Sequence, residues 1–257
     1  MVMIIERNSE LLVEFKKNIP SPTDIARSAI DTGLSGNKGK PDFIKKNFSH
    51  LVEQLQVDAY NIYLVAQKKA WKKAIARFCA SNLDKNAKLD EVVAFLQERL
   101  KDFDGFFLSV SQSRRSRAGS TFEDIMHELF KRLDYPFDEQ QIINGKPDFL
   151  MPGRAYYDKN APECIIFTAK RTLRERWRQI VIEGTKSRGF FLATIDEDVS
   201  ESGLDQMKNN KIYLVVPSRL KGKIPHYTEA PNVISFEDFF EDYLDPAMRR
   251  WKKAGII

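Results

Sequence analysis

Two short segments of the chain carry residues that could together bind a metal ion and hydrolyse a phosphodiester. Asp148 stands in Lys-Pro-Asp before one apolar run, and Lys170 follows a second apolar run, Cys164–Ala169. Hydrolysis near neutral pH needs a metal that polarises the phosphate and generates a hydroxide-like water, and Mg²⁺ prefers carboxylate oxygens. A nearby lysine can stabilise the developing charge and orient the water. Asp148 and Lys170 are therefore candidate metal-binding and catalytic residues.

The position two before this lysine, where such sites ordinarily carry Asp or Glu, is Thr168. Either the site is inactive, or the missing carboxylate comes from elsewhere in the chain. Glu183, on the helix expected after the lysine strand, could be swung toward the metal. The string Gly-Lys-Pro-Asp-Phe also occurs at residues 39–43, so it is not diagnostic alone. We interpret this first copy as a loop, because no lysine-bearing strand follows it.

A candidate base-reading segment begins four residues after Lys170, at Arg174-Glu175-Arg176. Arginine can bond guanine O6 and N7 bidentately, and glutamate can accept from the amino group of cytosine. These three residues therefore form a chemically sufficient reader of a GG/CC step. The alternative is an ordinary solvated helix face.

The apolar pattern predicts one α/β domain over residues 1–257, with a helical N-terminal region (1–105) and a catalytic core (106–257). The core is expected to contain a helix from Ser120 to Leu133, opened by a capping box. The expected elements are helices over 60–80, 89–100, 120–133 and 171–182, a loop over 31–41, and strands over 148–151, 164–169, 190–194 and 212–216.

Composition is compatible with a nucleic-acid partner but does not require one. Lys and Arg number 41 against 36 Asp and Glu, a formal net charge of +5. Cys79 and Cys164 lie in no Cys-x-x-Cys or Cys/His cluster, which argues against a zinc ribbon or a disulfide scaffold. The N-terminus lacks the pattern of a signal peptide, and no apolar run is long enough to span a membrane. We expect a soluble, cytoplasmic protein that does not contact membranes.

These residues resemble the CCGG family of type II restriction endonucleases, in the branch that contains EcoRII, SsoII and PspGI. That branch has the same displaced carboxylate and an Arg-(Asp/Glu)-Arg reader four residues beyond the catalytic lysine. The block from Gln112 through Arg114 to Glu123 looks like the segment that opens its catalytic domain. The resemblance covers residues 110–185 and implies a PD-(D/E)XK core, a mixed central sheet flanked by helices.

The resemblance implies that Asp148 and Glu183 bind Mg²⁺, that Lys170 is catalytic, and that Glu123 is a further acidic, metal-binding residue at the active site. It also implies that Gln112 touches double-stranded DNA from the minor groove, that the products carry 5′-phosphates, and that a cognate DNA methyltransferase accompanies the enzyme. A palindromic site requires a two-fold symmetric reader, so we expect a homodimer, with a tetramer possible. For Glu123 an alternative role is to complete the capping box with Ser120.

Some members of the branch bind CCNGG or CCWGG sites and extrude the central base onto an aromatic side chain. Trp71, in the Lys-rich stretch 67–73, is the candidate stacking surface, although a helix tryptophan usually belongs to a core. An uninterrupted CCGG core would need no extrusion.

Two other functions stay open at the level of sequence. One is a repair or junction-resolving nuclease of the same fold without strict sequence specificity, against which the Arg-Glu-Arg segment argues. The other is a catalytically inactive DNA-binding module, in which Thr168 marks the loss of the essential acid.

Overall fold

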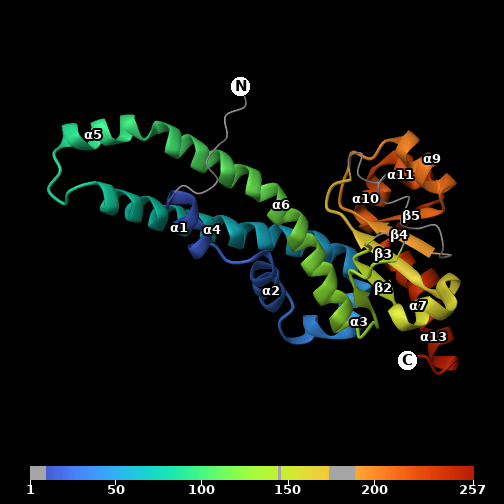
Figure 1. Ribbon diagram of the computed structural model, residues 1–257. Helices are drawn as coiled ribbons and strands as arrows, with labels where there is room; N and C mark the ends of the chain where they lie inside the picture. Colours follow the sequence, from blue (N-terminus) through green and yellow to red (C-terminus); the bar gives the residue numbers. More distant parts are fainter. Residues whose placement is uncertain (1–9, 144–145, 174–188) are drawn as a thin grey trace.

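The computed structural model describes residues 10–143, 146–173 and 189–257. Its N-terminal half is helical and its C-terminal half is built on a six-stranded mixed sheet (Figure 1). Both the helical N-terminal region and the strands expected from the apolar runs are confirmed. In the described residues no helix is long and apolar enough to cross a membrane.

The helices of the N-terminal half are short at the start and very long afterwards. They are α1 (Glu10–Asn18), α2 (Pro22–Gly33), the 3-10 turn η1 (Gly36–Gly39), α3 (Pro41–Lys46), α4 (Phe48–Asn82), α5 (Leu89–Glu98) and α6 (Leu100–Arg132). In Figure 1, α4 and α6 run side by side as an arm that reaches away from the sheet, with α5 at its far end. Helices α1 and α2 pack on this pair.

Two local predictions in this region are wrong. Residues 39–43 are not a loop, because α3 begins at Pro41, a residue whose fixed φ suits the first helical turn. The predicted helix start at Ser120 is also wrong, because α6 runs unbroken from Leu100 to Arg132. Gly119 and Ser120 cost helix propensity, but packed residues on both sides, such as Val110 and Phe122, outweigh that cost. The expected boundary at residue 105 falls inside this helix.

The sheet joins an antiparallel edge to a parallel half. The strand order is β1-β2-β3-β4-β5-β6. The antiparallel pairs are formed by β1 (Asp138–Glu139), β2 (Phe149–Met151) and β3 (Ile165–Ala169). The parallel pairs are formed by β3, β4 (Gly189–Ala193), β5 (Ile212–Val216) and β6 (Val233–Ser235). The short strands β1 and β6 were not predicted, because β1 contains no apolar residue and the apolar run at β6 is broken by Ser235.

The remaining elements cover the sheet. They are α7 (Arg154–Asn160), η2 (Ala161–Glu163), α9 (Glu201–Asn209), α10 (Ser218–Lys223), α11 (Pro225–Glu229), α12 (Phe236–Asp238), the π-helix η3 (Phe239–Leu244) and α13 (Asp245–Lys253). Successive strand residues point to opposite faces. Phe167 and Phe191 therefore pack toward α4, α6 and η3, whereas Ile166 and Leu192 pack toward α7, α9, α10 and α11.

Aromatic side chains join the helical arm to the sheet. Phe130 of α6 is fully buried, with its ring centroid 5.1 Å from that of Phe167 and 5.3 Å from that of Phe149. Phe48, at the start of α4, and Phe240 pack against the same ring. These contacts fix the end of α6 over β2 and β3, the two strands that carry the candidate active site.

Candidate active site

Three charged side chains from three elements meet beside β3. Lys170, directly after β3, places its Nζ 2.7 Å from Oε1 of Glu123 on α6 and 3.0 Å from Oδ2 of Asp148 before β2. The backbone N–H of Ala169 also donates to Oδ2 of Asp148, at 2.8 Å. We call Glu123, Asp148 and Lys170 the carboxylate–lysine cluster. Because both carboxylates contact one nitrogen, they are immediate neighbours.

Burial and charge shift two of these groups. Burial raises the pKa of Glu123, the nearby charge of Asp148 raises it further, and the contacts with Lys170 oppose both effects. Burial would lower the pKa of Lys170, but the two carboxylates together raise it, so the amine stays protonated. The cluster thus holds a cation between two acids in a partly desolvated setting, which is typical of functional sites.

The alternative role of Glu123 as a capping residue is excluded. Ser120 and Glu123 lie within α6 rather than at its start, and the Glu123 side chain turns to Lys170. The structure therefore brings Glu123, Asp148 and Lys170 together, as the expected active site requires. Glu183, the expected displaced carboxylate, lies outside the described residues, as do Arg174, Glu175 and Arg176.

The donor atoms at this site suit a hard divalent cation. Glu123 and Asp148 supply carboxylate oxygens, which are the ligands that Mg²⁺ prefers. Thr168, at the position where an acid is usual, is buried, and its hydroxyl has no hydrogen-bond partner in the described ranges. Residues 10–143, 146–173 and 189–257 contain no cluster of three or more acidic, His or Cys ligands.

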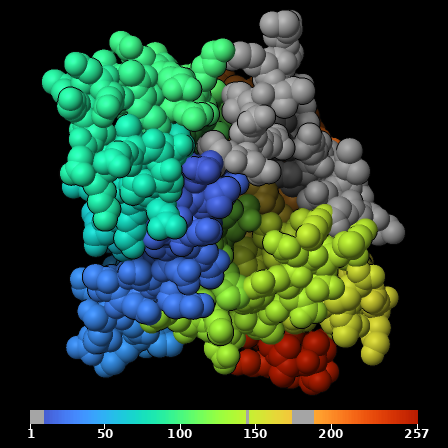
Figure 2. Space-filling view, turned by 60° about the vertical axis from the view of Figure 1, so that its left-hand side comes forward, coloured from blue at the N-terminus to red at the C-terminus, as the bar shows by residue number. Residues whose placement is uncertain are grey.

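A groove beside the cluster opens between the N-terminal helices and the β1–β2 region. Pro22, Thr23 and Arg27 of α2 face Glu123, His127 and Asp148 across it. Figure 2 shows this hollow between the blue N-terminal segment and the yellow-green residues near 130–150. At the edge of this groove, His127 contacts Glu139 at 2.5 Å.

Comparison with known proteins places the chain in a family. The EcoRII C-terminal family model matches residues 81–240, well over half of the sequence and all three members of the carboxylate–lysine cluster. The chain belongs to this family. The type II restriction enzyme SsoII of Shigella sonnei is 33% identical over 160 residues, which cover 58% of this chain and 52% of SsoII. EcoRII of Escherichia coli is 38% identical over 128 residues, covering 48% of this chain and 32% of EcoRII. The chain thus matches about half of one curated relative and about a third of the other.

Two solved structures share the fold along almost the whole chain. A metal-depleted complex of Ecl18kI with uncleaved DNA superposes with a TM-score of 0.77 at 26% identity, covering 95% of this chain and 83% of that one. The complex of the restriction endonuclease PspGI with substrate DNA gives a TM-score of 0.66 at 20% identity, covering 92% and 96%. These likenesses confirm the restriction-endonuclease-like core expected from the sequence.

Gln112 and Trp71 lie on the arm, away from the cluster in sequence and on different helices. Gln112 is exposed on α6, three turns before Glu123. Trp71 lies on α4, where its ring packs edge-to-face on Phe107 at 5.9 Å and beneath the guanidinium of Arg114. Its Nε1 is buried and has no hydrogen-bond partner in the part of the chain that the structure describes. The indole is therefore largely engaged by its own neighbours.

The sequence did not reveal a basic, aromatic cavity of about 340 Å³ between α4, α6 and the end of β3. Tyr60 and Tyr63 of α4 line it together with Arg114 and Arg117 of α6 and Arg171, the residue after Lys170. We call this cavity the arginine pocket. A sequence signal existed in the tyrosines three residues apart on one helix, but nothing in the sequence placed them opposite the arginines of α6.

Contacts within the chain hold the walls of the arginine pocket. Arg114 donates to Oε1 of buried Gln67 at 2.7 Å, and Gln67 in turn donates to the hydroxyl of Tyr63. Arg117 lies over the Tyr63 ring and donates to the carbonyl of Pro20 at 2.6 Å. Burial lowers the pKa of Arg117. Within the described ranges neither arginine has a carboxylate partner.

Proposed function

We propose that this chain is a metal-dependent type II restriction endonuclease that breaks both strands of duplex DNA within a short CC/GG-containing site. The observation that carries the proposal is the carboxylate–lysine cluster, which joins Lys170 to Glu123 and Asp148 at one end of β3. Membership of the EcoRII C-terminal family supports it, as do two relatives named as type II restriction enzymes.

In the proposed reaction Asp148, Glu123 and Glu183 would hold Mg²⁺. The bound ion would polarise the scissile phosphate and lower the pKa of a water molecule. Ala169 N–H orients Asp148 through its 2.8 Å bond to Oδ2, and Oδ1, which also accepts from Lys170 at 3.2 Å, would be the oxygen that binds the metal. Lys170, kept protonated by its two acidic neighbours, can stabilise negative charge on the phosphate and orient the attacking water. The family resemblance implies that the products would carry 5′-phosphate and 3′-hydroxyl ends.

Sequence recognition is assigned to Arg174, Glu175 and Arg176 in the major groove and to Gln112 in the minor groove. Arg174, the first residue of the proposed reader, follows Leu173 directly and lies four residues after Lys170. The reader would therefore lie close to the catalytic lysine. The sites that suit this reader are CCNGG or CCWGG, or an uninterrupted CCGG core.

Extrusion of a central base stays part of the proposal, but its stacking partner changes. Trp71 was predicted for this role, but its ring contacts Phe107 edge-to-face and lies beneath the guanidinium of Arg114. Tyr60 is 51% exposed and lines the arginine pocket beside Arg171, which follows the catalytic lysine directly. A pocket with a free aromatic face and cationic walls suits a nucleotide. We therefore favour Tyr60.

A two-fold symmetric site calls for at least a homodimer, and a restriction enzyme needs a cognate DNA methyltransferase to protect the host. Both are expected partners in the proposed function. Neither of them takes part in the cleavage chemistry described above.

The test is digestion of phage DNA by the purified chain with Mg²⁺ and with a chelator, followed by run-off sequencing of the products. A discrete fragment pattern that needs Mg²⁺, with all ends inside one CC/GG-containing sequence, is the expected result. Random degradation would indicate the repair or junction nuclease instead. Specific binding without any cleavage would indicate the inactive module.

A further inference from the structure

The short segment between the catalytic lysine and the proposed reader is tied to the end of β4 at three points. Lys170 N–H donates to the carbonyl of Ala193 at 2.9 Å, which continues the parallel ladder of β3 and β4. The Thr194 hydroxyl donates to the carbonyl of Arg171 at 3.2 Å. Leu173 N–H donates to Oδ2 of Asp196 at 2.7 Å. Residues 170–173 are therefore held in place by two side-chain contacts as well as by the hydrogen bonds between β3 and β4.

Thr194 and Asp196 form one connected unit. The N–H of Asp196 donates to the Thr194 hydroxyl at 3.1 Å, so this hydroxyl both donates and accepts. Oδ1 of Asp196 accepts from the N–H of Asp198 at 3.2 Å. Both carboxylate oxygens of Asp196 are thus occupied by backbone N–H groups, one on each side. A bond to a charged acceptor is about twice as strong as a neutral one, which suits a holding role.

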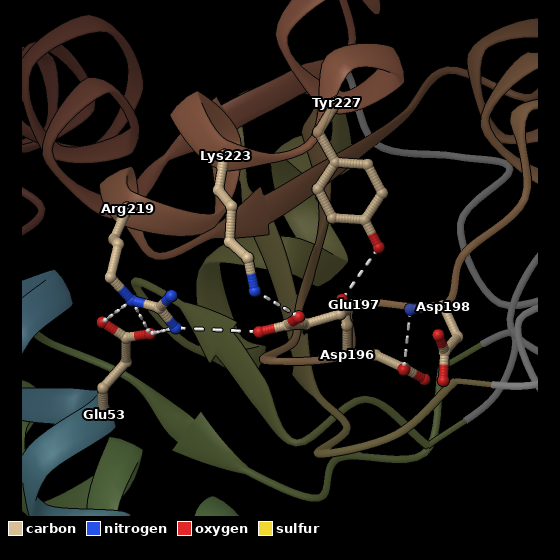
Figure 3. A network of polar contacts seen from close by, with 7 residues as sticks. All are labelled: Glu53, Asp196, Glu197, Asp198, Arg219, Lys223 and Tyr227. Atoms are coloured by element: carbon tan, nitrogen blue, oxygen red, sulfur yellow. Dashed lines mark hydrogen bonds and ion pairs between the residues drawn. The ribbon is translucent and has the colours of Figure 1, made fainter.

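The loop that carries Asp196 is itself held from three helices, as Figure 3 shows. The Tyr227 hydroxyl of α11 donates to the carbonyl of Asp196 at 2.8 Å and accepts from the N–H of Val199 at 3.2 Å. Glu197 pairs with Lys223 of α10 at 2.9 Å. Arg219, also of α10, bridges Glu197 at 3.7 Å and Glu53 of α4 at 2.6 Å. The Asp196 carboxylate is therefore presented by a braced loop.

The other end of the tie is also fixed, because the Leu173 side chain is fully buried in the core between the sheet and α9–α11. Its backbone N–H and its side chain are both anchored. Arg171 and Thr172 between the anchors are exposed. The segment fixed in this way therefore ends at Leu173, the residue directly before the proposed reader in the sequence.

We propose that Asp196, supported by Thr194, is a positioning residue that sets the register between the catalytic Lys170 and the base-reading residues that follow Leu173. This role rests on the proposed function. The contacts of residues 170–173 with Thr194 and Asp196, together called the tie, fix both ends of this four-residue segment. Correct placement of the lysine and correct base contacts would therefore depend on each other. Misplacement by about 1 Å can cost up to about 100-fold in rate, so such a tie would affect specificity.

The experiment compares four variants with the wild-type chain. Asp196→Ala removes both acceptors, Asp196→Asn keeps one, and Thr194→Val removes the hydroxyl at nearly constant volume. Asp198→Asn is the matched control, because its side chain lies in the same loop and makes no hydrogen bond to any described residue, while its backbone N–H is kept. For each protein, kcat and KM are measured on the cognate site and on a site with one outer G·C pair replaced. The amide exchange of Leu173 and the unfolding temperature are measured as well.

Asp196→Ala is expected to accelerate exchange of the Leu173 amide, to lower cognate kcat/KM about 10- to 100-fold, and to narrow the ratio of cognate to altered-site cleavage. Asp196→Asn and Thr194→Val should fall between it and wild type, and Asp198→Asn should match wild type. Faster Leu173 exchange with an unchanged cleavage ratio would show that the tie only supports the fold, and would overturn the proposal. Unchanged Leu173 exchange would show that Asp196 does not hold the segment. A wild-type chain that does not cut would instead remove the proposed function, and this role with it.

Discussion

The carboxylate–lysine cluster and the arginine pocket both place positive charge beside the end of β3, but they compensate it differently. In the cluster, one lysine contacts two carboxylates of its own chain. In the pocket, the hydrogen-bond partners of Arg114 and Arg117 among the described residues are a side-chain amide and a carbonyl, and tyrosine rings lie nearby. A cation that is paired with carboxylates of its own chain is held in one position, which suits a catalytic role. Cations without acidic partners are available to an anionic polymer that arrives from outside.

The largest effect on cleavage is expected from substitutions in the carboxylate–lysine cluster. Asp148→Ala and Lys170→Ala should each reduce cleavage by at least about 10³-fold, because they remove a metal ligand and the cation that faces the phosphate. Specific DNA binding, measured in Ca²⁺, should survive because the pocket and the reader are intact. Glu183→Ala should behave in the same way. Normal cleavage by that variant would contradict the displaced-carboxylate assignment.

A smaller effect is expected from the proposed reader. Replacing Arg174, Glu175 or Arg176 by alanine should cost about 1–3 kcal/mol of binding to the cognate site. Binding to random DNA should change much less, because base contacts carry the discrimination. Titration of both DNAs with each variant tests this. Equal losses on both would identify these residues as phosphate contacts.

The sequence predicted the cluster better than it predicted the pocket, and the reason is physical. Asp148 and Lys170 stand at the ends of buried strands, whose apolar runs are strong local signals, and neighbouring strands bring their ends together. Thr168 could be recognised as a departure because it occupies a fixed position relative to Lys170. These inferences needed only short-range pattern and sheet geometry.

The pocket depends on which faces of two long helices meet, and a sequence does not state that. Tyr63 and Arg117 are far apart along the chain and meet only because α4 and α6 run side by side. The same limit explains Ser120, whose capping pattern looked like a helix start until α6 proved to continue through it. Likewise, no local pattern linked Asp196 to Leu173 across two strands.

The uncompensated arginines should be visible in the salt dependence of binding. If Arg117 contacts a phosphate, Arg117→Gln should weaken binding about tenfold and reduce the slope of log affinity against log salt by about one. Arg250→Gln is the matched control, because its guanidinium is already paired with Glu163 and it does not line the arginine pocket. Equal changes in slope for the two variants would show that pairing with a carboxylate does not decide which arginine contacts a phosphate.

The smallest and most discriminating effect concerns the central base of the site. If that base enters the arginine pocket, Tyr60 stacks on it, and Tyr60→Ala should cost about 1 kcal/mol, the low end for stacking on an aromatic ring. Trp71→Ala should cost less, since Trp71 lies eleven residues further along α4, about 16 Å away. With 2-aminopurine at the central position, fluorescence should rise on binding as the probe leaves the base stack. It should rise further in Tyr60→Ala, where the stacking ring is absent, and stay at the wild-type level in Trp71→Ala. The opposite order would return the role to Trp71. A cleavage site of even length, with CC and GG adjacent, would leave neither residue with a base to receive and would make the arginine pocket a contact for the backbone alone.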